Sequence, residues 1–174
     1  MTFWKFFIFA FLFFVLALIQ NSFLPYFSVI GVVPNLVFAL FFILVFFEPA
    51  NRYSEGLLYT IIAGFLLDLL SFSYFGINIG ALLLTYIAIK VILHFLKERQ
   101  KGYLLAYFIF IFLGSFIVYT VAIFLCTDFP HIAFLFRWNT MVLQLAYNVI
   151  TALIGFFIYK IFNGTGDRQL SLFS

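Results

Sequence analysis

One acidic residue stands inside an apolar stretch that is long enough to cross a membrane. Asp68 lies within residues 64–84, where the other side chains are apolar, small or uncharged. A carboxylate at the centre of a bilayer helix costs about 2.5 to 3.5 kcal/mol, so it is usually buried against protein or held near a wet interface. Asp68 is therefore the first candidate site. It either accepts hydrogen bonds that lock a helix bundle or takes part in proton or cation coupling.

Uncharged amides offer hydrogen-bond partners for this carboxylate. Asn78 opens the apolar segment that follows the turn at Gly76, and Gln144 and Asn148 lie further along the chain. We expect Asp68 to accept from a helix N-terminus or from these amides. Such a structural role competes with one in which the same groups touch a ligand.

A polar stripe runs along the last apolar segment. Steps of four, three and four residues join Gln144, Asn148, Thr151 and Gly155, which places them on one face of a helix. Amide and hydroxyl groups across membrane helices are worth about 0.6 to 2 kcal/mol per bond, so the stripe is expected to face other helices. A ligand-lined cavity and a contact with a partner's helix are the alternatives.

Groups for enzymatic chemistry are missing from the sequence. It has no HExxH motif, no second aspartate at membrane depth, no Ser/His pair at a shared depth and no glycine-rich phosphate loop. His131 has no second histidine or cysteine at metal spacing, and the chain has a single cysteine. We expect no enzyme, no metal and no cofactor. The net charge of +3 is too small and dispersed to indicate nucleic-acid binding.

Composition defines the class of protein. The chain has 174 residues, of which 67% are hydrophobic and 9% charged, against about 45 to 50% and about 25% in soluble domains. It is predicted to be an all-α integral membrane protein with one six-helix transmembrane domain over residues 1–162 and a tail over 163–174. The helices are expected at residues 3–21, 33–47, 56–70, 77–95, 103–126 and 140–162. Pro34 is placed in the first turn of the second helix, and the third is short for a full crossing.

Basic residues predict the topology. With the N-terminus inside, most Lys and Arg residues fall in or beside cytoplasmic segments, Lys90 reaches the same side, and Arg137 alone falls outside. Both termini are therefore expected in the cytoplasm. Asp68, Asn78 and the residues around Gln20 and Pro34 then lie toward the outer leaflet.

Several stretches together resemble the family of the rod shape-determining protein MreD. They are Gln20-Asn21, Pro34-Asn35 at the opening of the second helix, the glycine, three apolar residues and aspartate of Gly64 to Asp68, and Phe75-Gly76 with Asn78. The resemblance covers the whole chain by layout and residues 20–85 by motif. Asn35 departs from it, because the family commonly has an aspartate there, which speaks against an ion-dependent role for this position.

The resemblance implies a scaffold in the elongasome of the bacterial cytoplasmic (inner) membrane. Such a protein would bind the single-pass protein MreC. Through MreC it would influence RodA, the class B penicillin-binding transpeptidase and MreB, and so support peptidoglycan synthesis and cell shape. The site residues would be those of the motifs above together with Gln144 and Asn148, with membrane lipids around them.

The family is also similar in fold to the S subunits of energy-coupling-factor transporters, which bind small molecules. That similarity supports an alternative function, in which Asp68, Asn78, Gln144 and Asn148 line an outward-facing pocket for a small molecule or a lipid-linked precursor. Ala10 and Ala17 are seven residues apart with bulky residues between them, which argues against the small-residue docking pattern of those subunits.

Overall fold

The computed structural model describes residues 3–28, 31–48, 53–70, 74–96, 104–126 and 138–163. These residues form six α-helices and no strand. Four helical segments are long and apolar enough to cross a membrane: Phe6–Phe27, Ile77–Phe95, Leu104–Cys126 and Thr140–Ile161. The all-α class is thus confirmed, with four helices that could cross a membrane, while six complete crossings stay a prediction.

The first helix continues past its expected end at residue 21. α1 spans Phe3–Leu18 and passes into a π-helical turn at Ile19–Phe23 and a 3-10 turn at Leu24–Phe27. Pro25 is tolerated there because it occupies the start of the 3-10 turn, where a missing N–H costs no hydrogen bond. The helical segment therefore carries Gln20 and Asn21 within it.

The second helix is shorter than predicted. α2 spans Leu36–Phe46, and Asn35 caps it by accepting a hydrogen bond from the Phe38 N–H at 2.9 Å. The expected start at residue 33 was wrong, because asparagine is a strong N-cap and Pro34 lies outside the helix before it. Its 11 residues rise about 16 Å, against a hydrocarbon core of about 30 Å. α2 is a core helix inside the bundle.

The other helices follow the predicted layout closely. α3 spans Tyr53–Leu70, three residues longer at its start than expected, and α4 spans Ile77–Leu96. α5 spans Leu104–Cys126, and α7 spans Trp138–Asn163. With 18 residues, α3 reaches the lower end of the range of about 17 to 25 that a crossing needs.

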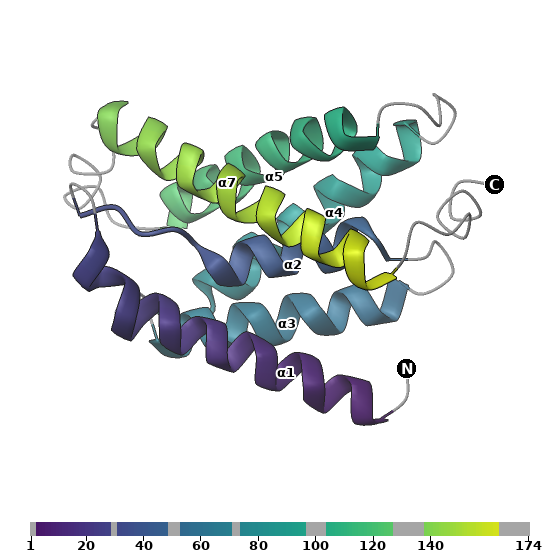
Figure 1. Ribbon diagram of the computed structural model, residues 1–174, viewed down its shortest axis with the longest axis horizontal. Coiled ribbons are helices and arrows are strands. Elements are labelled where there is room, and N and C mark those ends of the chain that lie inside the picture. The colour runs from purple at the N-terminus through teal and green to yellow at the C-terminus, as the bar shows by residue number, and fades with distance from the viewer. Residues whose placement is uncertain are drawn as a thin grey trace.

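α2 lies at the middle of the bundle, between α1 and α3 on one side and α5 and α7 on the other (Figure 1). Eight of its 11 residues are buried. Phenylalanine rings fill the space between α2 and α5. The centroid of the Phe42 ring lies 5.2 Å from that of Phe108 and 5.0 Å from that of Phe112. These edge-to-face pairs form the core around which the longer helices pack.

The chain alternates between the two ends of the bundle. The start of α1 and the end of α7 lie at the same end (Figure 1). We call this the terminal end, and the opposite one the distal end. α3 runs from the terminal end to the distal end, so Asp68, near the end of α3, belongs to the distal end.

Candidate functional site

The Asp68 carboxylate binds the first turn of the next helix. Its Oδ2 accepts hydrogen bonds from the N–H groups of Gly76 (2.9 Å) and Ile79 (3.2 Å). Its Oδ1 accepts from the N–H and the Nδ2 of Asn78, at 2.9 and 3.0 Å. These four donors match the roughly four lone-pair sites of a carboxylate. Asp68 therefore satisfies the otherwise unpaired N–H groups at the start of α4, where a negative charge is also favoured by the helix dipole.

Two glycines make this contact possible. Gly76 has a φ of +99°, a conformation that lets the chain turn back so that its own N–H points at Asp68. At Gly64 a Cβ atom would lie 2.6 Å from the Ile79 Cα, so only glycine allows α3 to approach α4 this closely. Both residues belong to the predicted motif, and their roles here are structural.

A chain of hydrogen bonds extends from Asp68 across the bundle. Asn78 Oδ1 accepts from the Tyr119 hydroxyl at 2.8 Å, and that hydroxyl accepts from Asn35 Nδ2 at 3.5 Å. The Asn35 N–H then donates to Asn148 Oδ1 at 2.6 Å. We call Asp68, Asn78, Tyr119, Asn35 and Asn148 the polar network. It connects α3, α4, α5, the cap of α2 and α7 near the distal end.

The structure places the predicted residues unequally. Gln20, in the π-helical turn after α1, lies beside the network without joining it, and its Oε1 accepts from the Val37 N–H at 3.2 Å in the first turn of α2. Asn21 instead donates to Ala17 O of its own helix, at 2.9 Å. Pro34 precedes the Asn35 cap, and Gln144 is not joined to the network within the described part of the chain. On α7, Asn148 is fully buried and Gly155 lies against Ile43 of α2, whereas Thr151 is half-buried and lines a groove.

Tyr119 is the network residue that the sequence reasoning missed. It lies on α5 and is buried together with Ser115 and Ala122 of the same helix. A signal for its role exists, because a buried tyrosine hydroxyl usually finds a hydrogen-bond partner. The sequence does not tell which helix supplies that partner.

A second polar cluster lies toward the terminal end. The Glu48 carboxylate pairs with Lys90 Nζ at 2.5 Å and accepts from the Gly56 N–H at 2.5 Å. The Lys90 amine also donates to Val45 O at 3.3 Å, and its side chain is only 16% exposed. Lys90 thus reaches toward the terminal end, as expected if that end is cytoplasmic, but the Glu48 side chain, 1% exposed, holds its amine within the bundle. The side of the membrane stays a prediction.

The two buried carboxylates cannot act as a catalytic pair. Glu48 contacts Gly56 and Asp68 lies 12 residues further along α3, which corresponds to about 18 Å of helix. Paired carboxylates that work on one bond lie less than about 10 Å apart. Among the described residues, no group of three His, Cys, Asp or Glu side chains could hold a metal ion.

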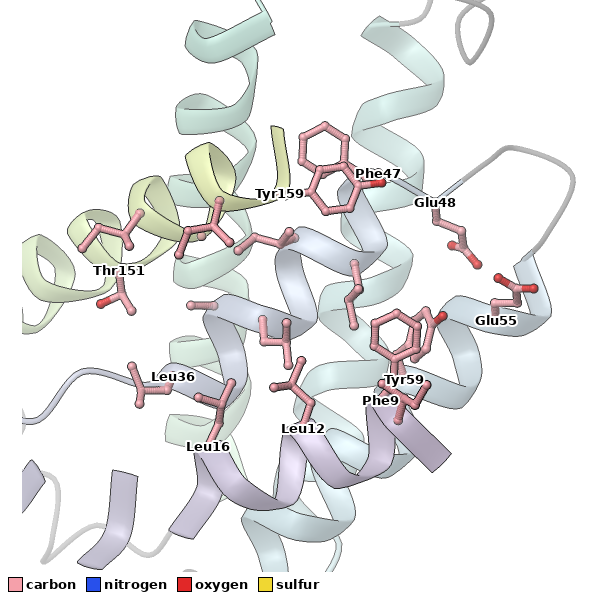
Figure 2. A pocket seen from close by; sticks show the side chains of 18 residues that line it. Phe9, Leu12, Leu16, Leu36, Phe47, Glu48, Glu55, Tyr59, Thr151 and Tyr159 are labelled. Carbon is pink, nitrogen blue, oxygen red and sulfur yellow. The ribbon is translucent and has the colours of Figure 1, made fainter. Parts of the chain in front are cut away.

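An apolar groove of about 740 Å³ lies between α1 and α7, with α2 at its base (Figure 2). α1 contributes Ile8, Leu12 and Leu16, and α7 contributes Thr151, Ile154 and Ile158. Glu48, Glu55 and Tyr59 lie at one end of the groove. The polar network is not part of its lining.

Comparison with known protein families identifies the chain. A family model described as rod shape-determining protein MreD matches residues 1–163 of the 174. The chain belongs to the MreD family. MreD is a family of membrane proteins with a role in rod shape determination, and it is not a known enzyme family. Comparison with curated proteins and with solved structures gave no match.

The residues on which the MreD resemblance was based are concentrated in the contact between α3, α4 and the cap of α2. Gly64, Asp68, Gly76 and Asn78 together fix the turn from α3 into α4. Asn35 donates and accepts hydrogen bonds without a charge, so Asp68 is the one carboxylate in the polar network. In this MreD-family chain the motif residues build the distal end of the bundle.

Proposed function

We propose that this chain is a non-catalytic scaffold of the rod complex in the bacterial inner membrane, where it binds MreC. Through MreC it supports RodA, the class B penicillin-binding transpeptidase and MreB in peptidoglycan synthesis. The observation that carries the proposal is the use of Asp68, whose carboxylate oxygens accept four hydrogen bonds from the first turn of α4. A carboxylate used in this way stabilises a bundle and presents a rigid surface.

The proposed topology has six crossings with both termini in the cytoplasm, in an arrangement similar to S subunits of energy-coupling-factor transporters. The shared end of α1 and α7 supports it, because both would then begin and end on the cytoplasmic side (Figure 1). α2, with its 11 residues, would cross only together with the extended segment that precedes it.

Co-purification tests the scaffold function. The tagged chain is extracted from its native membrane in a mild detergent, and the bound proteins and small molecules are identified by mass spectrometry. We expect MreC and the transpeptidase in the eluate. An unrelated membrane protein with the same tag serves as the control. Recovery of a transporter's ATPase and coupling subunits, without MreC, would contradict the scaffold.

One observation favours a second candidate function, an S-subunit-like binder of a small molecule or lipid-linked precursor. Asn148 is fully buried, and its Nδ2 has no hydrogen-bond partner within the described part of the chain. A buried unpaired donor is costly, so a water molecule or a ligand oxygen beside it would stabilise the protein. The same mass spectra test this function, which requires one dominant polar ligand in stoichiometric amount.

A further inference from the structure

The start of α2 lies inside the membrane domain. α2 has 11 residues, which rise about 16 Å, and it ends toward the terminal end, just before Glu48. Its first residue, Leu36, is therefore well short of the distal surface of a hydrocarbon core about 30 Å thick. We call residues 33–36 the cap segment, and the first three of them are not helical. Backbone of this kind occurs at membrane depth only where protein or water supplies hydrogen-bond partners.

Asn148 of α7 presents an unpaired donor to the cap segment. Its side chain is fully buried, and its Oδ1 accepts from the Asn35 N–H at 2.6 Å. This bond fixes the orientation of the carboxamide, because the reversed amide would place Nδ2 against another donor. Nδ2 belongs to the same planar group and so lies beside the cap segment, yet it has no hydrogen-bond partner within the described part of the chain. Leaving such a donor unpaired is costly, so an acceptor is expected next to it.

The backbone at the start of α2 adds further unpaired groups. The Val37 N–H, in the first turn, donates to Gln20 Oε1 at 3.2 Å. The Leu36 N–H, one residue earlier, has no partner among the described residues, and the Pro34 carbonyl accepts no hydrogen bond from them. Gln20 Oε1 accepts one of the two hydrogen bonds that a carboxamide oxygen can take. Donors and acceptors are thus both left over at this place.

An uncharged group that both accepts and donates fits this set. A cation would face the unpaired donors Asn148 Nδ2 and Leu36 N–H. An anion would have no counter-charge, because Lys90 and Lys160, the basic residues whose side chains are described, lie toward the terminal end. A water molecule accepts two hydrogen bonds and donates two, and buried waters make about three. The cap segment is half-buried along its whole length, so protein atoms do not fill all the space beside it.

We propose that a water molecule is bound at the start of α2 as an integral part of the membrane domain. It accepts hydrogen bonds from Asn148 Nδ2 and the Leu36 N–H, and it donates to the Pro34 carbonyl or to Gln20 Oε1. The water joins α7 to the first turn of α2 and extends the polar network beyond Asn148. It takes the place that a ligand oxygen would have in the second candidate function.

Solid-state NMR of the labelled protein in lipid bilayers tests the water site, through the rate at which magnetisation passes from water to single N–H groups. The decisive comparison is Asn148 Nδ2 against Asn78 Nδ2, because both carboxamides are buried but that of Asn78 is paired with a carboxylate. The Leu36 N–H is compared with the paired N–H of Val37. We expect transfer to Asn148 and Leu36 to be at least about threefold faster than to the two controls.

The outcomes separate the water site from both proposed functions. Equally slow transfer to Asn148 Nδ2 and Asn78 Nδ2 would overturn the water site. Contacts of Asn148 Nδ2 with carbon or phosphorus nuclei of a lipid or a co-purified molecule, in place of water, would also overturn it and would favour the second candidate function. Neither result depends on whether MreC co-purifies, so the scaffold can stand or fall separately.

A pair of variants tests whether the two donors share one water. Leu36→Pro removes the N–H at the first helical position, where proline is tolerated, and Asn35 before it has a ψ of 86°, outside the α region that a following proline disfavours. Leu36→Ala is the matched control, because it removes the same side chain and keeps the N–H. We expect Leu36→Pro to slow transfer to Asn148 Nδ2 about threefold and Leu36→Ala to leave it unchanged.

Equal transfer to Asn148 Nδ2 in Leu36→Pro and Leu36→Ala would show that the Leu36 N–H does not hold this water, contrary to the proposal. Thermal unfolding in mild detergent checks that both variants are folded. The comparison of Asn148 with Asn78 in the wild-type chain needs no substitution, so it decides for or against the water site even if Leu36→Pro does not fold.

Discussion

At the scale of single residues, both buried carboxylates in the described part of the chain accept hydrogen bonds from the start of a helix. Asp68 accepts from three N–H groups at the start of α4, and Glu48 accepts from the Gly56 N–H in the first turns of α3. In a bilayer these N–H groups have no water to bind, so an acceptor supplied by a neighbouring helix satisfies them. The two carboxylates therefore act as caps: each accepts hydrogen bonds from N–H groups at the start of a helix, as an N-cap side chain does in a soluble protein.

Replacement of Asp68 by asparagine tests the role at the start of α4. Asparagine keeps the side-chain volume, but it replaces one carboxylate oxygen by an NH₂ group. This NH₂ group is itself a donor and would face the N–H groups that Asp68 Oδ1 or Oδ2 now accepts from. Hydrogen bonds to a charged group are worth about 1.5 to 3 kcal/mol each, so we expect the free energy of unfolding to fall by about 3 kcal/mol. Thermal unfolding in mild detergent measures the change.

The control for Asp68→Asn is Asn21→Ala, which removes an exposed side chain bonded to its own helix. It is expected to change the free energy of unfolding by less than about 0.5 kcal/mol. If Asp68→Asn unfolded at the wild-type temperature and left the complex and rod shape intact, the structural importance given to this carboxylate would be refuted.

At the scale of helices, the architecture depends on close approach between α3 and α4. These helices meet where Gly64 lies against the backbone of Ile79, whose N–H also binds Asp68 at 3.2 Å. The helix contact and the carboxylate contact are thus one unit. A side chain at position 64 separates the helices and lengthens the hydrogen bonds at the same time.

We therefore expect Gly64→Ala to be destabilising by about 1 to 3 kcal/mol, the usual cost of overpacking. The new Cβ would meet the Cα and N atoms of Ile79, at 2.6 and 3.0 Å, and the backbone cannot rotate away. Gly80→Ala on the facing helix is the matched control, because nothing lies within 4 Å of its added Cβ. Thermal unfolding of both variants decides the matter, and equal unfolding temperatures would contradict the close contact.

At the scale of the whole molecule, polar contacts toward both ends join the helices of the bundle, and an apolar groove lies along one side. The polar network joins the helices near the distal end, and the ion pair of Glu48 and Lys90 joins α2, α3 and α4 toward the terminal end. The groove between α1 and α7 lies on the side where neither cluster reaches.

The ion pair gives the test at this scale. We expect Lys90→Met to lower the free energy of unfolding by about 3 to 5 kcal/mol, because it leaves the Glu48 carboxylate, 1% exposed, without its cation. Lys160→Met, at an exposed position of α7, is the control and should be neutral. In the double variant Glu48→Gln/Lys90→Met part of the loss should return. Equal unfolding temperatures of Lys90→Met and Lys160→Met would mean that the ion pair does not stabilise the bundle.

The sequence by itself determined the membrane class and the helix order, and it predicted that Asp68 is bound by other groups of the protein. Long apolar runs with few charges have no stable place in water, and a carboxylate within such a run must be bound, so both conclusions follow from transfer free energies. The motif around Gly64 and Gly76 also predicted the family. The predicted partners, MreC among them, stay predictions.

Only the tertiary structure decided which groups meet. Tyr119 and Asn35 are 84 residues apart, and Asn35 and Asn148 are 113 apart, so their contacts cannot be predicted from local spacing in the sequence. The late start of the second helix, the pairing of Lys90 with Glu48 and the groove between α1 and α7 likewise depend on how helices pack. Periodicity along one chain reports which face of a helix is polar, whereas the identity of the facing side chain is set by long-range packing.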